Sequence, residues 1–186
     1  MSTNITIRRA LPEDAKIISE LSEITFRDTY RGSFPESDNE FFIQKCFATD
    51  VVANELRDAN DFYFIAFADS VPAGYMRLKE DYSDYPAMKR YKALELKRIY
   101  VLKEFHSKKI GAALMSFAIH FANQKNFEAL WLGVYEHNAI ARAFYKKWGF
   151  SDTGFVHTFY VGNTGQIDHW LIKFMKAGEH TKDTYP

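Results

Sequence analysis

A short turn in the middle of the chain carries the residue types that bind anions. The turn runs from Glu104 to Gly111 and holds a histidine, a serine and two lysines: His106, Ser107, Lys108 and Lys109. Backbone N–H groups in the first turn of a helix have no partner within the helix, and the helix dipole adds positive charge there, so phosphate oxygens can complete the hydrogen bonding. Two lysines at this place cost about 0.3–1 kcal/mol unless an anion offsets them. The turn therefore indicates either a phosphate site or a solvated pair of lysines on a loop.

A strand and a helix position this turn. Residues 94–101 are rich in Leu, Ile, Tyr and Val, which is typical of a buried strand. A second strand is predicted over 128–135, where apolar and other side chains alternate. Such a strand–helix–strand unit predicts a parallel pair of strands, with a ligand site at the carboxyl end of the first. The apolar residues at helical spacing between the two strands are Ile110, Ala113, Leu114, Phe117, Ala118 and Phe121.

The remaining segments predict one α/β domain with a mixed sheet of about seven strands and flanking helices. Neither an internal repeat nor a low-complexity linker divides the chain. The turn residues at 162–165, Gly-Asn-Thr-Gly, favour a hairpin between the last two strands. The further predicted elements are a strand over 3–10, helices over 12–27, 39–47, 50–57 and 138–148, a hairpin over 61–80, and strands over 152–162 and 166–175.

Composition limits the classes of partner. The 186 residues include 24 Lys plus Arg and 24 Asp plus Glu, so the net charge gives no broad reason to expect nucleic-acid binding. Cys46 is the only cysteine, which excludes an internal disulfide, and the N-terminal residues show no apolar targeting segment. No apolar run is long enough to span a bilayer, and the histidines lack metal-ligand spacing. We therefore expect a cytoplasmic protein without a metal, a membrane segment or a nucleic-acid partner.

Two stretches together resemble the GCN5-related N-acetyltransferase (GNAT) family. The first is VLKEFHSKKIGAALM, where the family pattern Arg/Gln-x-x-Gly-x-Gly/Ala falls on residues 106–111. His106 stands where the family usually has Arg or Gln, and Lys109 stands where it usually has the first Gly. The second is GVYEHNAIARAFYKKWGFSDTG, which agrees with the family pattern at more positions. They are Asn138, Ala141, Phe144, Tyr145, Lys147, Gly149 and Phe150.

The resemblance implies the acyl-CoA N-acyltransferase (GNAT) fold over residues 4–176, followed by a polar tail over 177–186. It implies acetyl-CoA as co-substrate and no metal. The backbone of Ile99, Tyr100 and Val101 would pair with the pantetheine arm like an added strand, and Asn138 would contact the same arm. The residues implied in binding the CoA diphosphate and its surroundings are His106, Ser107, Lys108, Lys109, Ile110, Gly111, Ala112 and Lys147.

Two residues are candidates for the chemistry. By the resemblance, Tyr145 lies near the CoA sulfur as general acid for the leaving thiolate; alternatively, it is only a core partner of Ala141. An alkylammonium has a pKa near 10.4, so a group must take its proton, and Glu95 on the central strand is our candidate base. Alternatively, Glu95 is only an ion-pair partner of Lys97 or Arg98. Asn138 has a second interpretation too, as a helix cap. Further acids that could bind a cationic acceptor are Asp28, Glu80, Asp81 and Asp84.

The resemblance implies an acetyl-CoA-dependent N-acetyltransferase that acts by direct attack in a ternary complex. Two segments are similar to the bacterial Pai-type polyamine acetyltransferases: LWLGVYEHNAIARAFYKKWGF and the hairpin YVGNTGQIDHWLIK. We therefore expect a small amine acceptor such as a polyamine. The alternatives are a non-catalytic acetyl-CoA sensor, suggested by His106 and Lys109, and an acetyltransferase of protein N-termini or lysines. The aromatic-rich last hairpin offers an interface for a homodimer.

Overall fold

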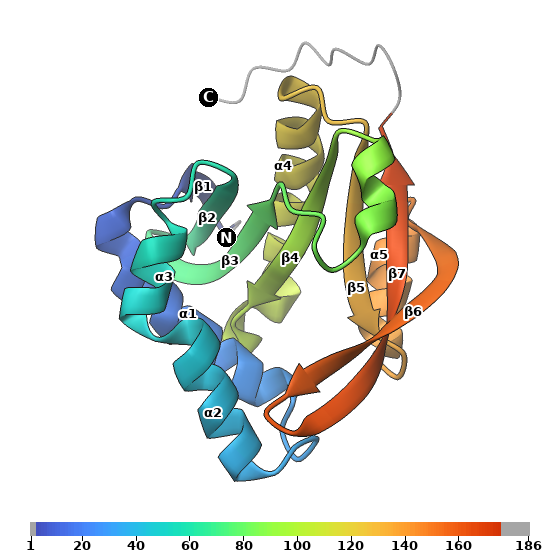
Figure 1. Cartoon of the computed structure of the whole chain (residues 1–186). Helices are drawn as coiled ribbons and strands as arrows, with labels where there is room; N and C mark the ends of the chain where they lie inside the picture. The colour runs from blue at the N-terminus through green and yellow to red at the C-terminus, as the bar shows by residue number, and fades with distance from the viewer. Residues whose placement is uncertain (1–2, 176–186) are drawn as a thin grey trace.

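Seven strands form one mixed sheet in the computed structural model, which describes residues 3–175 (Figure 1). Their spatial order is β1-β2-β3-β4-β5-β7-β6, and neighbours are antiparallel except β4 and β5, which are parallel. The predicted mixed sheet of about seven strands is confirmed. The strands are β1 (Ile5–Arg9), β2 (Asp61–Ala68), β3 (Val71–Lys79), β4 (Ala93–Val101), β5 (Ala129–Tyr135), β6 (Ser151–Val161) and β7 (Thr164–Phe174).

Helices cover both faces of this sheet. On one face α1 (Ala15–Thr29) and α3 (Thr49–Glu55) pack on β2 and β3, and α2 (Glu36–Phe47) packs on α1. On the other face lie α4 (Ile110–Gln124) and α5 (Ala139–Lys147). We call these the α1 face and the α4 face. The 3-10 turns are η1 (Pro12–Asp14), η2 (Pro86–Arg90) and η3 (Lys103–Lys108).

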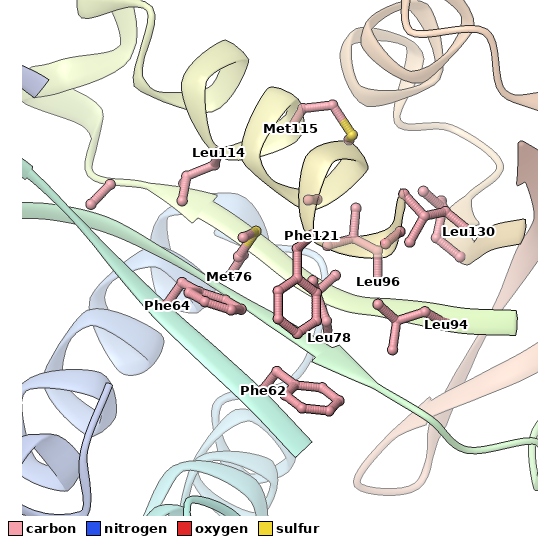
Figure 2. Close-up of a cluster of buried hydrophobic side chains, with 14 of the residues drawn as sticks. Phe62, Phe64, Met76, Leu78, Leu94, Leu96, Leu114, Met115, Phe121 and Leu130 are labelled. Atoms are coloured by element: carbon pink, nitrogen blue, oxygen red, sulfur yellow. The ribbon is translucent and has the colours of Figure 1, made fainter. Parts of the chain in front are cut away.

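The largest core fills the α4 face. Strand alternation sends every second side chain of β2, β3, β4 and β5 toward α4, and Figure 2 shows these side chains meeting the helix. Leu114 and Met115 of α4 are completely buried among them. The labelled strand residues of this cluster are Phe62, Phe64, Met76, Leu78, Leu94, Leu96 and Leu130.

The parallel pair at the centre of the sheet is very short. Within residues 3–175, β4 and β5 pair over three positions, from Ala93↔Ala129 to Glu95↔Trp131. The register of β4 against β3 shifts immediately afterwards, because Arg77 pairs with Arg98 and Leu78 pairs with Leu96, which leaves Lys97 as an extra residue. Such a β-bulge bends its strand. β4 and β5 therefore separate beyond Glu95, and the sheet is split at this point.

The β6–β7 hairpin reaches back across the split to the helices of the first half (Figure 1). Val161 and Phe159 at its tip pack with α1 and α2 in an aromatic cluster around Phe26. The Thr164 hydroxyl donates to Asp38 Oδ2 on α2 at 2.6 Å. The hairpin thus ties together the two halves that the split separates.

Most predicted elements lie where the periodicity placed them. The helix predicted from residue 39 begins three residues earlier, at Glu36, directly after Pro35. The predicted tail over 177–186 lies outside the described residues, so its separation from a domain over 4–176 stays a prediction. In residues 3–175 no helix combines the length and the apolar character that crossing a membrane requires.

Candidate active site

A cleft of about 820 Å³ occupies the split between β4 and β5. This volume falls in the range that small-molecule and cofactor sites use. One wall is the last part of β4, from Leu96 to Val101, and the other is the end of β5. The end of α1, the start of α4, one side of α5 and one residue of β7 close it. The cleft therefore lies at the carboxyl end of the first strand of the parallel pair, where the strand–helix–strand unit predicted a ligand.

The cleft joins the two faces of the sheet. Ile99 and Val101 pack with the core of the α4 face, whereas Tyr100 packs with the core of the α1 face. On β5, Val134 belongs to the α4 face, and the alternation places Tyr135 on the opposite one. A ligand that lies against α4 and α5 can thus meet a second ligand that enters from the α1 face.

The turn before α4 has the backbone that an anion site requires. Lys109 is the N-cap of α4 and has φ 63° and ψ 14°, the left-handed conformation that glycine adopts most easily. The lysine at this position, where the family pattern has glycine, therefore takes a backbone conformation typical of glycine. The His106 Nε2–H donates to the Val101 carbonyl at 2.9 Å, so the imidazole fastens the turn to the end of β4.

The start of α5 is fixed by a cap. The Asn138 side chain accepts a hydrogen bond from the Ala141 N–H at 3.0 Å, which confirms its predicted role as N-cap. Gly149 has φ 82°, as the residue after the helix often requires. Tyr145 lies on the side of α5 that faces the cleft. Burial raises the pKa of Tyr145 above its ordinary value, so its hydroxyl is protonated at neutral pH.

The cleft brings together most of the residues that the sequence proposed. It is not lined by Ser107, Lys108 or Glu95 among the described residues, and the Ile110 side chain is completely buried in the core. Ile110 can therefore offer only its backbone to a ligand. The proposed residues that do line the cleft are Ile99, Tyr100, Val101, His106, Lys109, Gly111, Ala112, Asn138, Tyr145 and Lys147.

Glu95 is buried beside the split and is engaged with Lys97. The Lys97 Nζ lies 3.0 Å from Glu95 Oε2 and 2.8 Å from Asp84 Oδ2. Burial raises the pKa of Glu95 to about 7, although the neighbouring Lys97 lowers it. The ion-pair alternative for Glu95 is thus present in the structure, and its pKa nevertheless lies where a base can work at neutral pH.

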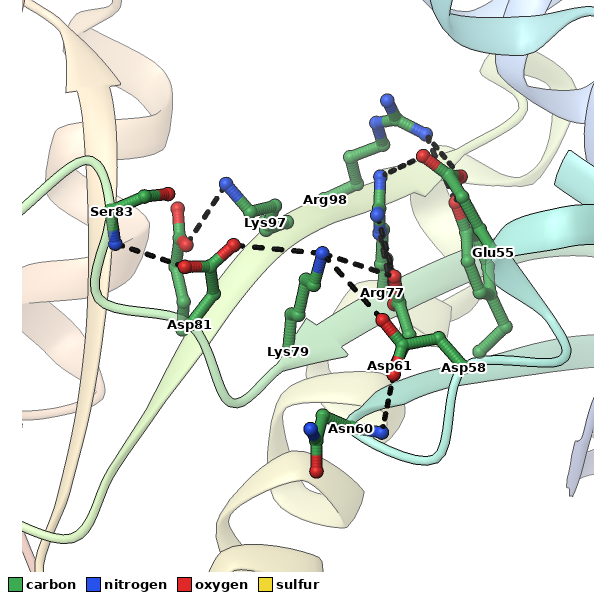
Figure 3. Close-up of polar contacts among 12 residues, drawn as sticks. Glu55, Asp58, Asn60, Asp61, Arg77, Lys79, Asp81, Ser83, Lys97 and Arg98 are labelled. Carbon is green, nitrogen blue, oxygen red and sulfur yellow. Dashed lines mark hydrogen bonds and ion pairs between the residues drawn. The ribbon is translucent and has the colours of Figure 1, made fainter. Parts of the chain in front are cut away.

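Several other acids proposed for acceptor binding are already paired. Asp28 pairs with Arg31 at 2.5 Å, and Asp81 pairs with Lys79 at 3.5 Å. Figure 3 shows the Lys79 pairs as part of a network along β3 that also joins Arg77 to buried Asp61. The network of Arg77 and Lys79 links β3 to β2 and to the loop after β3, so Asp81 has a structural role without a ligand, whereas Asp28 and Arg31 form a local pair at the end of α1.

The lining of the cleft also includes residues that the sequence did not single out, among them Tyr30 at the end of α1, Tyr135 at the end of β5, and Asp168 on β7. Asp168 is only 8% exposed, and burial raises its pKa to about 6. One sequence signal for Asp168 was present, because a carboxylate stands within the strand predicted over 166–175. Among residues 3–175, no group of three or more His, Cys, Asp or Glu side chains is placed to hold a metal ion.

Known proteins are similar to this chain in sequence. The sequence model of the acetyltransferase (GNAT) family matches residues 19–150. An uncharacterized N-acetyltransferase in the pepI 3′ region of Lactobacillus delbrueckii subsp. lactis is 30% identical over 174 residues, 92% of this chain and 98% of that protein. The spermidine N(1)-acetyltransferase of Thermoplasma acidophilum is 30% identical over 151 residues, 79% of this chain and 88% of that protein.

A solved structure shows the same fold. The PaiA N-acetyltransferase from Thermoplasma acidophilum, in complex with coenzyme A, superposes with a TM-score of 0.74 at 26% identity. The match covers 92% of this chain and 99% of that one. The acyl-CoA N-acyltransferase fold that the resemblance implied is confirmed.

The left-handed conformation of Lys109 predicts that Lys109→Gly stabilises the protein. Glycine adopts this conformation without the Cβ clash, so we expect a gain of about 0.5–1 kcal/mol in the free energy of unfolding. The matched control is Lys108→Gly, which removes the same charge at a position without positive φ. That variant should lose about 0.5–1 kcal/mol. Urea denaturation without ligand measures both, and equal changes would contradict the conformational explanation.

The raised pKa of Glu95 predicts a pH-dependent difference between the wild type and Glu95→Gln. Between pH 4.5 and about 7 the Glu95 carboxyl is ionised in the unfolded protein but keeps its proton in the folded protein. The unfolded state therefore binds fewer protons, and rising pH lowers the free energy of unfolding of the wild type. The stability of the wild type relative to the variant should fall across this range by on the order of 2–3 kcal/mol. Urea titrations at both ends of the range measure it; a constant or rising difference would show that Lys97 keeps Glu95 ionised.

Proposed function

Because the chain belongs to the acetyltransferase (GNAT) family and is an acetyl-CoA-dependent N-acetyltransferase, we propose that its acceptor is a primary amine of a small cationic molecule such as a polyamine. The acetyl group passes by direct attack in a ternary complex. The observation that carries this proposal is the cleft through the split sheet, which gives the donor and the acceptor access from opposite faces. Acetyl-CoA supplies the acetyl group as a thioester, and the protein must hold it and manage two protons.

The donor side of the cleft fits CoA. The edge of β4 that faces β5 is left without a neighbouring strand after Glu95 in the described chain, so an extended amide-containing arm can add to it as a strand does. Ile99, Tyr100 and Val101 are the residues that would hold this arm. The diphosphate would lie at the start of α4, where first-turn N–H groups and Lys109 coincide. Lys147 and Asn138 line the same cleft from the side of α5.

Tyr145 is the proposed general acid. It lies on the α4 face of the cleft, where the donor would lie, and its hydroxyl is protonated at neutral pH. A thiolate that leaves the thioester needs such a proton. The interpretation of Tyr145 as a core residue only does not account for its place on the wall of the cleft.

Glu95 remains the proposed base for the acceptor nitrogen. It lies on the strand that forms one wall of the cleft, and its pKa of about 7 suits proton transfer at neutral pH. Glu95 does not line the cleft itself, so the proton would reach it through a bridging water molecule or after the Lys97 side chain moves away from Glu95.

The relatives support a polyamine as the acceptor class. One of them is named a spermidine N(1)-acetyltransferase, and the solved neighbour is named PaiA N-acetyltransferase.

We also propose a homodimer formed by the last hairpin. β6 is an edge strand of the sheet, and its Phe155, Val156 and Tyr160 side chains are exposed.

Tyr145→Phe tests the proposed acid. Removing only the hydroxyl should lower kcat with spermidine by about 100-fold, because general acid catalysis contributes on this scale. The affinity for CoA should stay within a factor of about two, since the phenol is not proposed to bind the diphosphate or the arm. Release of free thiol measures turnover, and calorimetry measures CoA binding.

The control for this experiment is Tyr91→Phe, which removes the hydroxyl of a tyrosine that lies outside the lining of the cleft. It should leave turnover and CoA affinity unchanged. A Tyr145→Phe enzyme that turns over as fast as the wild type would rule out Tyr145 as the acid. A wild type that binds CoA but acetylates no amine in a panel of polyamines, amino acids and peptides would contradict the proposed acceptor.

A further inference from the structure

Asp168 differs from the other buried carboxylates of the described chain. Three of these pair with a cationic side chain: Asp14 with Arg8, Asp61 with Arg77, and Glu95 with Lys97. Asp38 accepts from the Thr164 hydroxyl. In residues 3–175, Asp168 forms no salt bridge, and its side-chain hydrogen bond comes from the uncharged amide of Gln166 at 2.8 Å to Oδ1. Burying a carboxylate without a counter-charge is unfavourable, so this position lacks a cation.

The second oxygen of Asp168, Oδ2, has no hydrogen-bond partner among the described side chains. Asp168 is one of the residues that line the cleft. Gly133 on β5 lies beside Asp168 Oδ2, and a side chain at this position would crowd its neighbours, because a Cβ there would lie 3.0 Å from the Trp170 ring and 3.1 Å from the His157 ring. Neither neighbouring histidine supplies the missing charge. His169 lies on the opposite face of β7, where its Nδ1 pairs with Asp152 at 2.9 Å. His157 pairs in register with Asp168, but burial lowers its pKa and so favours the neutral imidazole.

Asp168 lies on the α1 face of the split, away from the donor. On β7, Leu171 belongs to the core of the α4 face, whereas Trp170 belongs to the cluster on the opposite face. Asp168 is two residues from Trp170 and therefore shares its face. It pairs in register with Tyr135 of β5, and the pKa of Tyr30 is raised by burial and, to a smaller extent, by the charge of Asp168. A carboxylate here meets the molecule that enters from the α1 face.

We propose that Asp168 binds the ammonium group of the acceptor and makes the enzyme selective for cationic amines. This rests on the proposed function and adds the residue that recognises the substrate. The ammonium supplies the charge that Asp168 lacks within the chain, and Oδ2 accepts its hydrogen bond. The tyrosines at this end of the cleft, Tyr30 and Tyr135, suit an alkylammonium, because aromatic faces attract cations. Lys97 does not compete, since Glu95 and Asp84 hold its ammonium.

Asp168→Asn tests this role. The carboxamide has the same shape and keeps an oxygen for the Gln166 hydrogen bond, but it carries no charge. Calorimetry with spermidine, added to the protein saturated with CoA, should give at least tenfold weaker binding in the variant. KM for spermidine should rise by a similar factor while KM for acetyl-CoA stays within twofold. Without amine, the variant should melt at the same or a higher temperature, because a buried unpaired charge has been removed.

The matched control is Asp152→Asn, which removes an exposed carboxylate of β6 that lies outside the lining of the cleft. It should leave spermidine binding unchanged. Spermidine binding that is equal in the wild type and Asp168→Asn would overturn the proposal, as would a loss of kcat with unchanged KM. A lower melting temperature with weaker CoA binding would assign Asp168 to folding and also overturn it. Failure of the proposed function looks different: CoA then gives no heat with the wild type, or no amine is acetylated.

Discussion

The early end of the pairing between β4 and β5 is the constraint on which the site depends. Parallel strands normally stay paired, because each backbone N–H and C=O that leaves the ladder must find another partner. Here the pairing ends at Glu95, and the bulge at Lys97 turns β4 away from β5. The edge of β4 that is released is a template for an added strand. A ligand with amide groups along its length can form hydrogen bonds with the unpaired N–H and C=O groups of this edge, as β5 does with the first residues of β4.

The split also decides how two substrates can meet. A continuous sheet separates its two faces, so a donor on the α4 face could not reach an acceptor on the α1 face. Beyond Glu95 the two faces communicate through the cleft. Tyr145 approaches the cleft from one face, and Asp168 and Tyr135 approach it from the other. The β6–β7 hairpin holds the halves at a fixed separation through Asp38, Thr164 and the aromatic cluster around Phe26.

Local pattern predicted the elements, the turn over 104–111 and the cap at Asn138, because the turn and the cap each lie at the end of a regular element. The proposed roles of Tyr145 and of the β4 edge came from the family resemblance. The conformation of Lys109 could not be predicted from its residue type, because its backbone takes a left-handed conformation that is typical of glycine. The acceptor half was not predictable in the same way. Asp168 lies in the middle of a strand, and its role depends on the register of β7 with β5 and on the split, which join segments far apart in the chain.

Amide hydrogen exchange with and without CoA tests the central claim most directly. If the released edge of β4 and the start of α4 bind CoA, two sets of amides should exchange at least about tenfold more slowly in its presence, as newly bonded groups do. They are the amides within residues 97–101 that do not pair with β3 and those of residues 110–112. The amides of β2 serve as an internal reference, because their partners on β1 and β3 are unaffected. CoA that binds without protecting residues 97–101, or that protects a different part of the sheet, would contradict the account.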